Sequence, residues 1–146
     1  MQAKKIEMVR SLVLAGCICV AAGAIVLALI PWYASHLQNT ALRQAEMGYK
    51  VESLHSAEAA VFYNPLSAQA LFVLAGAEQR LGREEEAKST LIKATQIQPQ
   101  NYATWEQLAL YERDRWHEPE RAAEYFENAI SLNPADRHLR AEAGLP

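Results

Sequence analysis

Residues 68–101 read AQALFVLAGAEQRLGREEEAKSTLIKATQIQPQN, and this stretch decides the fold. Apolar and small residues recur at helical spacing in its first half and again in its second half, with Gly82 between them and Pro99 near the end. Glycine readily takes the left-handed conformation that ends a helix, and proline cannot continue one. The pattern therefore predicts one helix over residues 67–81 and a second over residues 84–97.

The same features return at a fixed interval. Pro65, Pro99 and Pro134 are separated by 34 and then 35 residues, and the extra residue falls in the turn at 116–119. Other positions with the 34-residue interval are Ala60 and Ala94; Leu37, Leu71 and Trp105; and Ala41, Ala75 and Ala109. A fixed period of this length is typical of stacked helical units. We therefore predict three units, over residues 34–67, 68–101 and 102–136.

These repeated residues resemble the tetratricopeptide repeat family. The residues that carry the resemblance are Leu71, Leu74, Ala75, Gly82, Ala87, Leu91, Ala94 and Pro99, then Trp105, Leu108, Ala109, Ala122, Phe126, Ala129 and Pro134. It covers residues 34–136 and implies an all-α solenoid whose first helices line a concave groove. Gln44, Glu78 and Glu112 depart from the family, which often has tyrosine at that position. Trp105 is expected to be buried between the second and third units, beside Phe126.

An apolar stretch precedes the repeats. Residues 11–30 carry no charge, and at about 1.5 Å per residue they span roughly the thickness of a bilayer core. The aromatic rings of Trp32 and Tyr33 follow, and such rings favour the headgroup region. Lys4, Lys5 and Arg10 precede the stretch. This excess of positive charge predicts a cytoplasmic N-terminus over residues 1–10, a single membrane span over 11–33, and an extracytoplasmic repeat domain in the periplasm or at the cell exterior.

Two processed forms are alternatives to this uncleaved anchor. Residues 22–24, Ala-Gly-Ala, resemble a signal-peptide cleavage site, but they lie inside an apolar run longer than such a peptide needs. Residues 14–17 resemble a bacterial lipoprotein box ending in Cys17, but the chain stays apolar after it. Both observations favour the membrane helix. Ala15, Cys19 and Gly23 form a small-residue stripe on which another membrane helix could pack.

Composition and motifs give no sign of catalysis. From residue 34 onward, 11 Lys and Arg are interspersed with 16 Asp and Glu, which argues against a nucleic-acid partner. The histidines are far apart, at His36, His55, His117 and His138, and no metal-ligand spacing or phosphate-binding loop is present. We therefore expect no enzyme activity, no metal and no cofactor, and we expect other protein subunits and membrane lipid as partners.

The candidate binding surface is the concave groove that the resemblance implies. By register its residues are Gln38, Asn39, Leu42, Gln69, Phe72, Val73, Gly76, Glu106, Gln107, Leu110 and Arg113. Phe72, Val73 and Leu110 are predicted to be free of packing between units, which favours an apolar ligand. The family's clamp for chaperone tails uses Lys, Asn and Arg where this chain has Gln38, Phe72 and Glu106, so we do not expect that class of partner. The alternative is a groove covered by the membrane-proximal segment or by the C-terminal tail.

The C-terminal residues 137–146 are predicted to form a short cap. Asp136 would begin a helix of about two turns, on which Leu139 and Ala143 share one face. A helix of this length should cover Phe126 and Ile130 incompletely, because a repeat array exposes the apolar face of its last unit. We therefore expect this edge, with the groove, to contact a partner.

These observations predict a membrane-anchored repeat scaffold that mediates protein–protein contact as an accessory subunit of a membrane or envelope complex. A narrower resemblance supports an alternative. Pro31-Trp32 and the stretch 64–67, Asn-Pro-Leu-Ser, are similar to the C-terminal tails of bacterial O-antigen ligases and polysaccharide polymerases. This resemblance implies a detached tail or accessory module of such an enzyme.

Overall fold

The structure, a computed structural model, describes the backbone of residues 2–144 and the side chains of residues 14–25 and 27–144. The side chains of Lys4, Lys5 and Arg10, on which the expected sidedness depends, lie outside that set. The elements are α1 (Gln2–Glu46), α2 (Lys50–Tyr63), α3 (Ala68–Arg80), α4 (Glu84–Ile97), α5 (Tyr102–Tyr111), the π-helix η1 (Glu112–Trp116), α6 (Pro119–Leu132) and α7 (Arg137–Glu142). Every regular element within residues 2–144 is a helix, which confirms the predicted all-α class.

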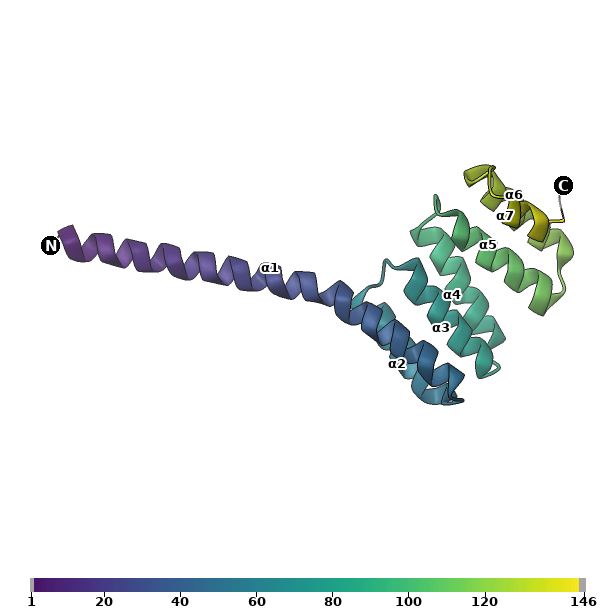
Figure 1. The fold of residues 1–146 in the computed structure, drawn as a ribbon, viewed down its shortest axis with the longest axis horizontal. Coiled ribbons are helices and arrows are strands. Elements are labelled where there is room, and N and C mark those ends of the chain that lie inside the picture. Colours follow the sequence, from purple (N-terminus) through teal and green to yellow (C-terminus); the bar gives the residue numbers. More distant parts are fainter. Residues whose placement is uncertain (1, 145–146) are drawn as a thin grey trace.

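The helices pair, and the pairs stack. α1 packs on α2, α3 on α4 and α5 on α6, and the pairs meet through contacts of α2 with α3 and of α4 with α5. Figure 1 shows this stack, with the N-terminal part of α1 projecting away from it. Units that contact mainly their neighbours along the chain form a solenoid. The three-unit helical solenoid predicted from the period is therefore confirmed.

The two helices of the middle unit, α3 and α4, begin and end within one residue of the positions that the sequence predicts. The hydroxyl of Ser67 accepts a hydrogen bond from the first turn of α3 at 3.2 Å. Gly82 has φ +75° between α3 and α4. Asn101 accepts a hydrogen bond from the first turn of α5 at 3.1 Å. Side-chain caps and a left-handed glycine stabilise helix ends, so local sequence explains where these helices begin and end.

The extra residue of the third unit is accommodated in a π-helical turn. α5 continues directly into η1, after which His117 has φ +54°. Gly48 and Gly82 hold the corresponding left-handed positions in the first two units. A π-turn pairs residues five apart instead of four, so it holds one more residue than an α-turn. The 35-residue spacing therefore arises at the end of the first helix of this unit.

The helix α1 joins the apolar stretch to the first unit without a break. It is long and apolar enough over 14–46 to cross a membrane, a criterion of length and composition alone. The boundary expected between residues 33 and 34 falls inside it. Pro31 also lies within α1, and proline kinks a helix because it lacks the N–H of the helical hydrogen bond. Figure 1 shows α1 changing direction before it packs on α2.

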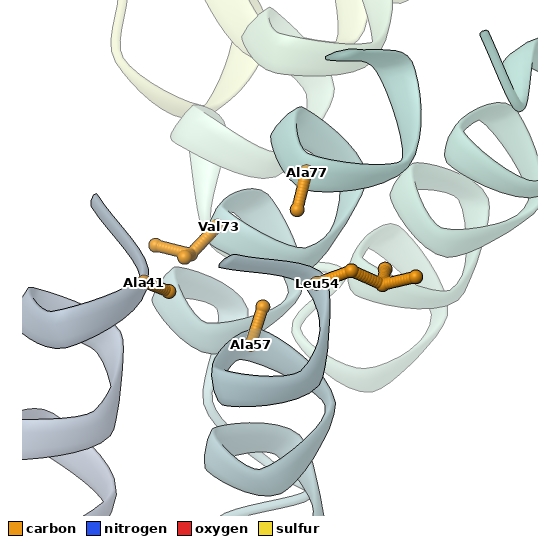
Figure 2. Packing of buried hydrophobic residues seen from close by; sticks show 5 residues of the cluster. All are labelled: Ala41, Leu54, Ala57, Val73 and Ala77. Carbon is orange, nitrogen blue, oxygen red and sulfur yellow. The ribbon is translucent and has the colours of Figure 1, made fainter. Parts of the chain in front are cut away.

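Small side chains hold the first two units together. Ala41 of α1, Leu54 and Ala57 of α2, and Val73 and Ala77 of α3 form one buried cluster (Figure 2). The alanines let the three helices approach closely, and the leucine fills the remaining space. Val73 is 6% exposed in this cluster. The expectation that Val73 is free for a ligand is therefore wrong, because it packs between units.

Two further clusters complete the core. One joins the second and third units through Leu91, Leu108 and Tyr111, and the other lies within the third unit around Phe126. Trp105 packs against the latter, and its indole N–H donates to a backbone carbonyl of the α4–α5 connection at 2.9 Å. Trp105 stays partly exposed. The expectation that it is buried between units is wrong, and Leu108, 1% exposed, fills that space.

Polar side chains, Gln44, Glu78 and Glu112, lie near the end of the first helix of each unit. In the first unit the Ser56 hydroxyl donates to the Gln44 amide oxygen at 2.7 Å. In the second unit burial raises the pKa of Glu78 above its usual range, and a hydrogen bond with Thr90 acts in the opposite direction. The Ser56–Gln44 hydrogen bond joins the two helices of the first unit.

The third unit uses an ion pair that crosses to its neighbour. The Lys88 Nζ on α4 lies 2.7 Å from the Glu112 Oε1, and the Glu112 side chain is completely buried. Lys88 Nζ also lies 4.5 Å from the centre of the Trp116 ring. No aligned hydrogen bond from a described residue reaches either carboxylate oxygen of Glu112. At 2.7 Å, however, the ammonium is in direct contact, so Lys88 compensates this buried charge.

The C-terminal helix α7 closes the stack. Asp136 caps it by accepting hydrogen bonds from the backbone N–H groups of its first turn. Leu139 is 0% exposed, and Phe126 beneath it is 3% exposed. Asp136 is the N-cap of a short helix, as expected, but the expectation that Phe126 is incompletely covered is wrong. Ile130 and Ala143 remain partly exposed at this edge.

Candidate functional site

A groove of about 450 Å³ lies between α3 and α5. Its lining residues are Phe72, Ala75, Gly76 and Gln79 of α3, Leu91 of α4, Gln107, Leu110 and Tyr111 of α5, and Asp114 and Arg115 of η1. The helices α3 and α5 are the first helices of the second and third units. The groove therefore lies between first helices, which are the helices that the resemblance to tetratricopeptide repeats implies as its lining.

The lining contains large apolar side chains. Phe72 comes from α3 and Leu110 from α5, and both are partly exposed. Gly76 lets the Arg80 side chain lie close to α3, where Arg80 Nη1 donates to the Gly76 carbonyl at 3.0 Å and a Cβ at Gly76 would lie 3.2 Å from that nitrogen. Gln107 is exposed on the α5 side. An apolar side chain could rest on Phe72 and Leu110 while the Gln107 amide bonds to a main chain.

Tyr111 fixes the wall of the groove to the preceding unit. Its phenol is 7% exposed, and its hydroxyl donates to Glu84 Oε2 at 2.5 Å. Burial raises the pKa of Tyr111, and the bond to Glu84 raises it further. The phenol therefore stays neutral, and its role is to hold α5 against the start of α4.

The polar rim comes from the end of α3 and from η1. With the Gln79 amide oxygen turned toward Arg115, that oxygen accepts a hydrogen bond from Arg115 Nη2 at 3.0 Å. Asp114 stands next to Arg115, and its carboxylate accepts from Arg113 Nε at 2.7 Å. The hydrogen bond from Arg113 lowers the pKa of Asp114. The lining thus includes one exposed cation, Arg115, and one exposed carboxylate, Asp114, which is paired with Arg113.

Two predicted groove residues are engaged by the C-terminal helix instead. Arg113 Nη1 donates to the Glu142 carboxylate at 3.0 Å and to its backbone carbonyl at 2.9 Å. Glu106 lies 3.8 Å from the His138 ring, and burial raises the pKa of this carboxyl. The C-terminal helix α7 therefore contacts the part of α5 around Glu106 and Arg113. It contributes no residue to the lining between α3 and α5.

The remaining predicted residues lie outside the groove lining. Gln38 is buried at 8% exposure on α1, whereas Asn39 and Leu42 are exposed there. Gln69 is exposed at the start of α3. The predicted set therefore contains four lining residues, which are Phe72, Gly76, Gln107 and Leu110.

Sequence reasoning missed Gln79, Tyr111, Asp114 and Arg115. They lie near the ends of the first helices, beyond the positions that the resemblance assigns to the groove. The signal for two of them was the 35-residue spacing, because η1 is where the extra residue lies and Asp114 and Arg115 belong to it. A π-turn rotates the side chains that follow it relative to a regular α-helix.

The small-residue stripe is exposed on α1. Ala15, Cys19 and Gly23 lie in the part of α1 that extends beyond the stack, and all three are exposed. A residue four positions along a helix lies on the same face. The structure thus presents them as one narrow face without a neighbour among the described residues.

No group of three or more His, Cys, Asp or Glu side chains within the described residues is arranged to hold a metal ion. His36, His55, His117 and His138 are exposed on separate elements.

Residues 68–101 match the family described as tetratricopeptide repeat. No curated protein matches the chain. The match covers the middle unit. Ser67 caps its first helix, Gly82 lies in the turn between its two helices, and Asn101 caps the helix that follows it.

Solved structures of repeat domains resemble the whole stack. The first TPR of Spaghetti (RPAP3) bound to an HSP90 peptide is 16% identical, with a TM-score of 0.64 over 77% of this chain and 89% of that one. The Sgt2 TPR domain from Aspergillus fumigatus is 18% identical, with a TM-score of 0.64 over 76% and 74%. PcrH from Pseudomonas aeruginosa is 18% identical, with a TM-score of 0.64 over 76% and 86%. At these identities the likeness shows the fold, and with the family match it supports a tetratricopeptide repeat protein.

Proposed function

We propose that this protein is a membrane-anchored scaffold that binds another protein through the groove between α3 and α5, as an accessory subunit of a membrane or envelope complex. The observation that carries the proposal is the open groove of about 450 Å³, whose lining combines Phe72 and Leu110 with the polar residues Gln79, Gln107 and Arg115. Apolar centres with polar rims are typical of surfaces that bind protein segments.

The chemistry of the groove favours a segment with one apolar anchor. Phe72 and Leu110 receive an apolar side chain, and Gln107 bonds to the main chain beside it. Asp114 and Arg115 then select the charges that flank this anchor. One solved relative, the first TPR of Spaghetti (RPAP3), was captured with an HSP90 peptide, which supports a protein segment as the ligand here.

The anchor is the second part of the proposal. α1 is long and apolar enough to cross a membrane, and its large apolar residues beyond the stack, such as Leu14, Ile18 and Leu27, are exposed. Exposed leucine and isoleucine on a helix of this length are stable in lipid. Lys4, Lys5 and Arg10 then place the N-terminus in the cytoplasm and the repeats in the periplasm or at the cell exterior.

Sidedness is tested by limited proteolysis of spheroplasts that carry the protein with an N-terminal epitope. We expect added protease to remove the repeats and to leave the epitope in a membrane-protected fragment. Detergent permeabilisation is the control, since it should expose the epitope as well. Repeats that survive in intact spheroplasts and are digested only after permeabilisation would contradict the sidedness inferred from Lys4, Lys5 and Arg10.

Partner binding is tested by a photo-crosslinking amino acid at Gln107, which is exposed and lines the groove. We expect an adduct with one protein after irradiation of intact cells, identified by mass spectrometry. Ser89 is the matched control position, because it is exposed on α4 and lies outside the lining. The Gln107 adduct should disappear when Phe72→Asp replaces an apolar side chain of the lining by a charge.

The identity of the adduct decides between the two assignments. A subunit of a membrane or envelope complex supports the scaffold, and a multi-pass glycan ligase or polymerase supports the alternative of an accessory module for that enzyme. Equal crosslinking from Gln107 and Ser89 would mean that the groove is not the contact surface.

A further inference from the structure

An apolar and aromatic patch lies where α1 enters the repeats. It consists of Trp32 and Tyr33 on α1 and of Phe62, Tyr63 and Leu66 at the end of α2 and in the α2–α3 connection, and we call it the membrane-edge patch. Trp32 is 66% exposed, Phe62 79% and Leu66 68%. Such large apolar side chains in one place rarely face water without a partner.

The patch is held in place by packing between the two segments. The Tyr33 and Tyr63 rings meet edge to face, with centroids 5.0 Å apart, and the Phe62 and Tyr63 rings do so at 5.3 Å. The α2–α3 connection is fixed from its other side, because the Gln98 side chain donates to the Leu66 carbonyl at 2.7 Å. Phe62 and Leu66 therefore keep a defined height along α1.

Phe62 and Leu66 lie at the level along α1 where the candidate membrane span ends. Trp32 and Tyr33 directly follow the apolar stretch, and Tyr63 touches Tyr33. A helix inserted over its apolar stretch therefore carries Phe62 and Leu66 to the level of the lipid headgroups. Figure 1 shows the α2–α3 connection beside α1 at the point where α1 joins the stack.

The charge pattern agrees with this position. No Asp, Glu, Lys or Arg occurs between Glu58 and Glu78, or between Arg10 and Arg43. The far end of α2 differs, because exposed Val51 there stands between the charged Lys50 and Glu52. Charged groups lose hydration at a membrane surface, whereas tyrosine and tryptophan favour that layer.

We propose that the membrane-edge patch rests in the headgroup layer of the bilayer and holds the repeat stack against the membrane surface. The proposal rests on the membrane anchoring proposed above and adds a second point of contact, from Phe62 and Leu66. A stack with two contacts has a defined tilt relative to the membrane, so the groove between α3 and α5 faces a constant direction.

The test uses the full chain in phosphatidylcholine vesicles, with Cys17 and Cys19 replaced by alanine and an environment-sensitive fluorophore on one new cysteine. The new cysteines are Phe62→Cys or Leu66→Cys in the patch, Val51→Cys as control and Ile25→Cys in the span. Val51 and Phe62 are both exposed and lie on α2, about 16 Å apart along the helix. The readout is the loss of emission caused by nitroxide-labelled lipids, with the nitroxide at the headgroup or deep in the acyl chain.

We expect the Phe62 and Leu66 labels to lose emission to the headgroup nitroxide, and the Val51 label to keep its emission. The Ile25 label should lose emission to the acyl-chain nitroxide. If the Ile25 label does so while the Phe62 and Leu66 labels respond no more than Val51, the patch proposal fails and the anchor stands. Stronger quenching of the patch labels from the acyl chain also overturns it. If the Ile25 label is not quenched, the anchor and the patch proposal both fail.

Discussion

Lys88→Met should lower the free energy of unfolding by about 3–5 kcal/mol, which would unfold much of a solenoid of this size. The Glu112 carboxylate is completely buried and has Lys88 Nζ 2.7 Å away as its compensating charge. Methionine keeps the length of the side chain but leaves the carboxylate without a cation. The measurement is urea denaturation of the detergent-solubilised protein, followed by circular dichroism.

Two comparisons separate the charge effect from a packing effect. Lys93→Met removes an exposed lysine from the same helix and should change stability by less than about 0.5 kcal/mol. Adding Glu112→Leu to Lys88→Met should restore most of the loss, because replacing both partners of a buried ion pair by apolar residues is often neutral. A single Lys88→Met variant as stable as the unchanged protein would show that this pair does not hold the second and third units together.

Leu139→Ala should destabilise the third unit by about 2–5 kcal/mol, the usual range for removing a buried leucine side chain. Leu139 is 0% exposed and packs with Ala109, Ala122, Phe126 and Ala129. α7 has only six residues, so Leu139 supplies most of its contact with the stack. Hydrogen exchange should report faster exchange in α5 and α6, and thermal unfolding should begin at a lower temperature.

Arg140→Ala is the matched control for this change. Arg140 is exposed on the same short helix, and its loss should leave the exchange of α5 and α6 unchanged. Unchanged exchange in the Leu139→Ala variant would mean that the third unit is stable without its cap. The ion pair and hydrogen bonds between Arg113 and Glu142 would then hold α7 without the leucine.

The sequence predicted the middle unit well because its boundaries depend on local chemistry. Ser67, Gly82 and Asn101 each determine a helix end through their own side chain or backbone, so reading them in order gives the helices. The stacking of units follows from the period, since each unit repeats the same apolar face. These features require no knowledge of distant contacts.

Features that depend on distant contacts were harder to predict. Val73 was expected at the surface, because its register matches that of a groove residue, but Leu54 and Ala41 pack against it from the first unit. Trp105 was expected inside, but its indole N–H bonds to a carbonyl near the surface. Register along one helix does not show which neighbour covers a residue.

The candidate site was predicted in part for the same reason. Phe72 and Leu110 follow from helical register, whereas Arg115 follows from the π-turn that displaces it. The contacts of Arg113 with Glu142 depend on where α7 folds back, and a stretch of twelve residues after Pro134 does not specify that path.

Because α1 is one helix from the apolar stretch into the first unit, the orientation of that stretch determines the direction in which the groove faces. Each residue of an α-helix advances by about 1.5 Å and turns by about 100°. In a membrane-anchored molecule, one residue inserted between the span and Ala41 would rotate the groove by about 100° around the helix axis and move it only about 1.5 Å along that axis. A flexible linker would absorb such an insertion. If the molecule is anchored as proposed, the number of residues in this part of α1 therefore sets the direction in which the groove faces its partner.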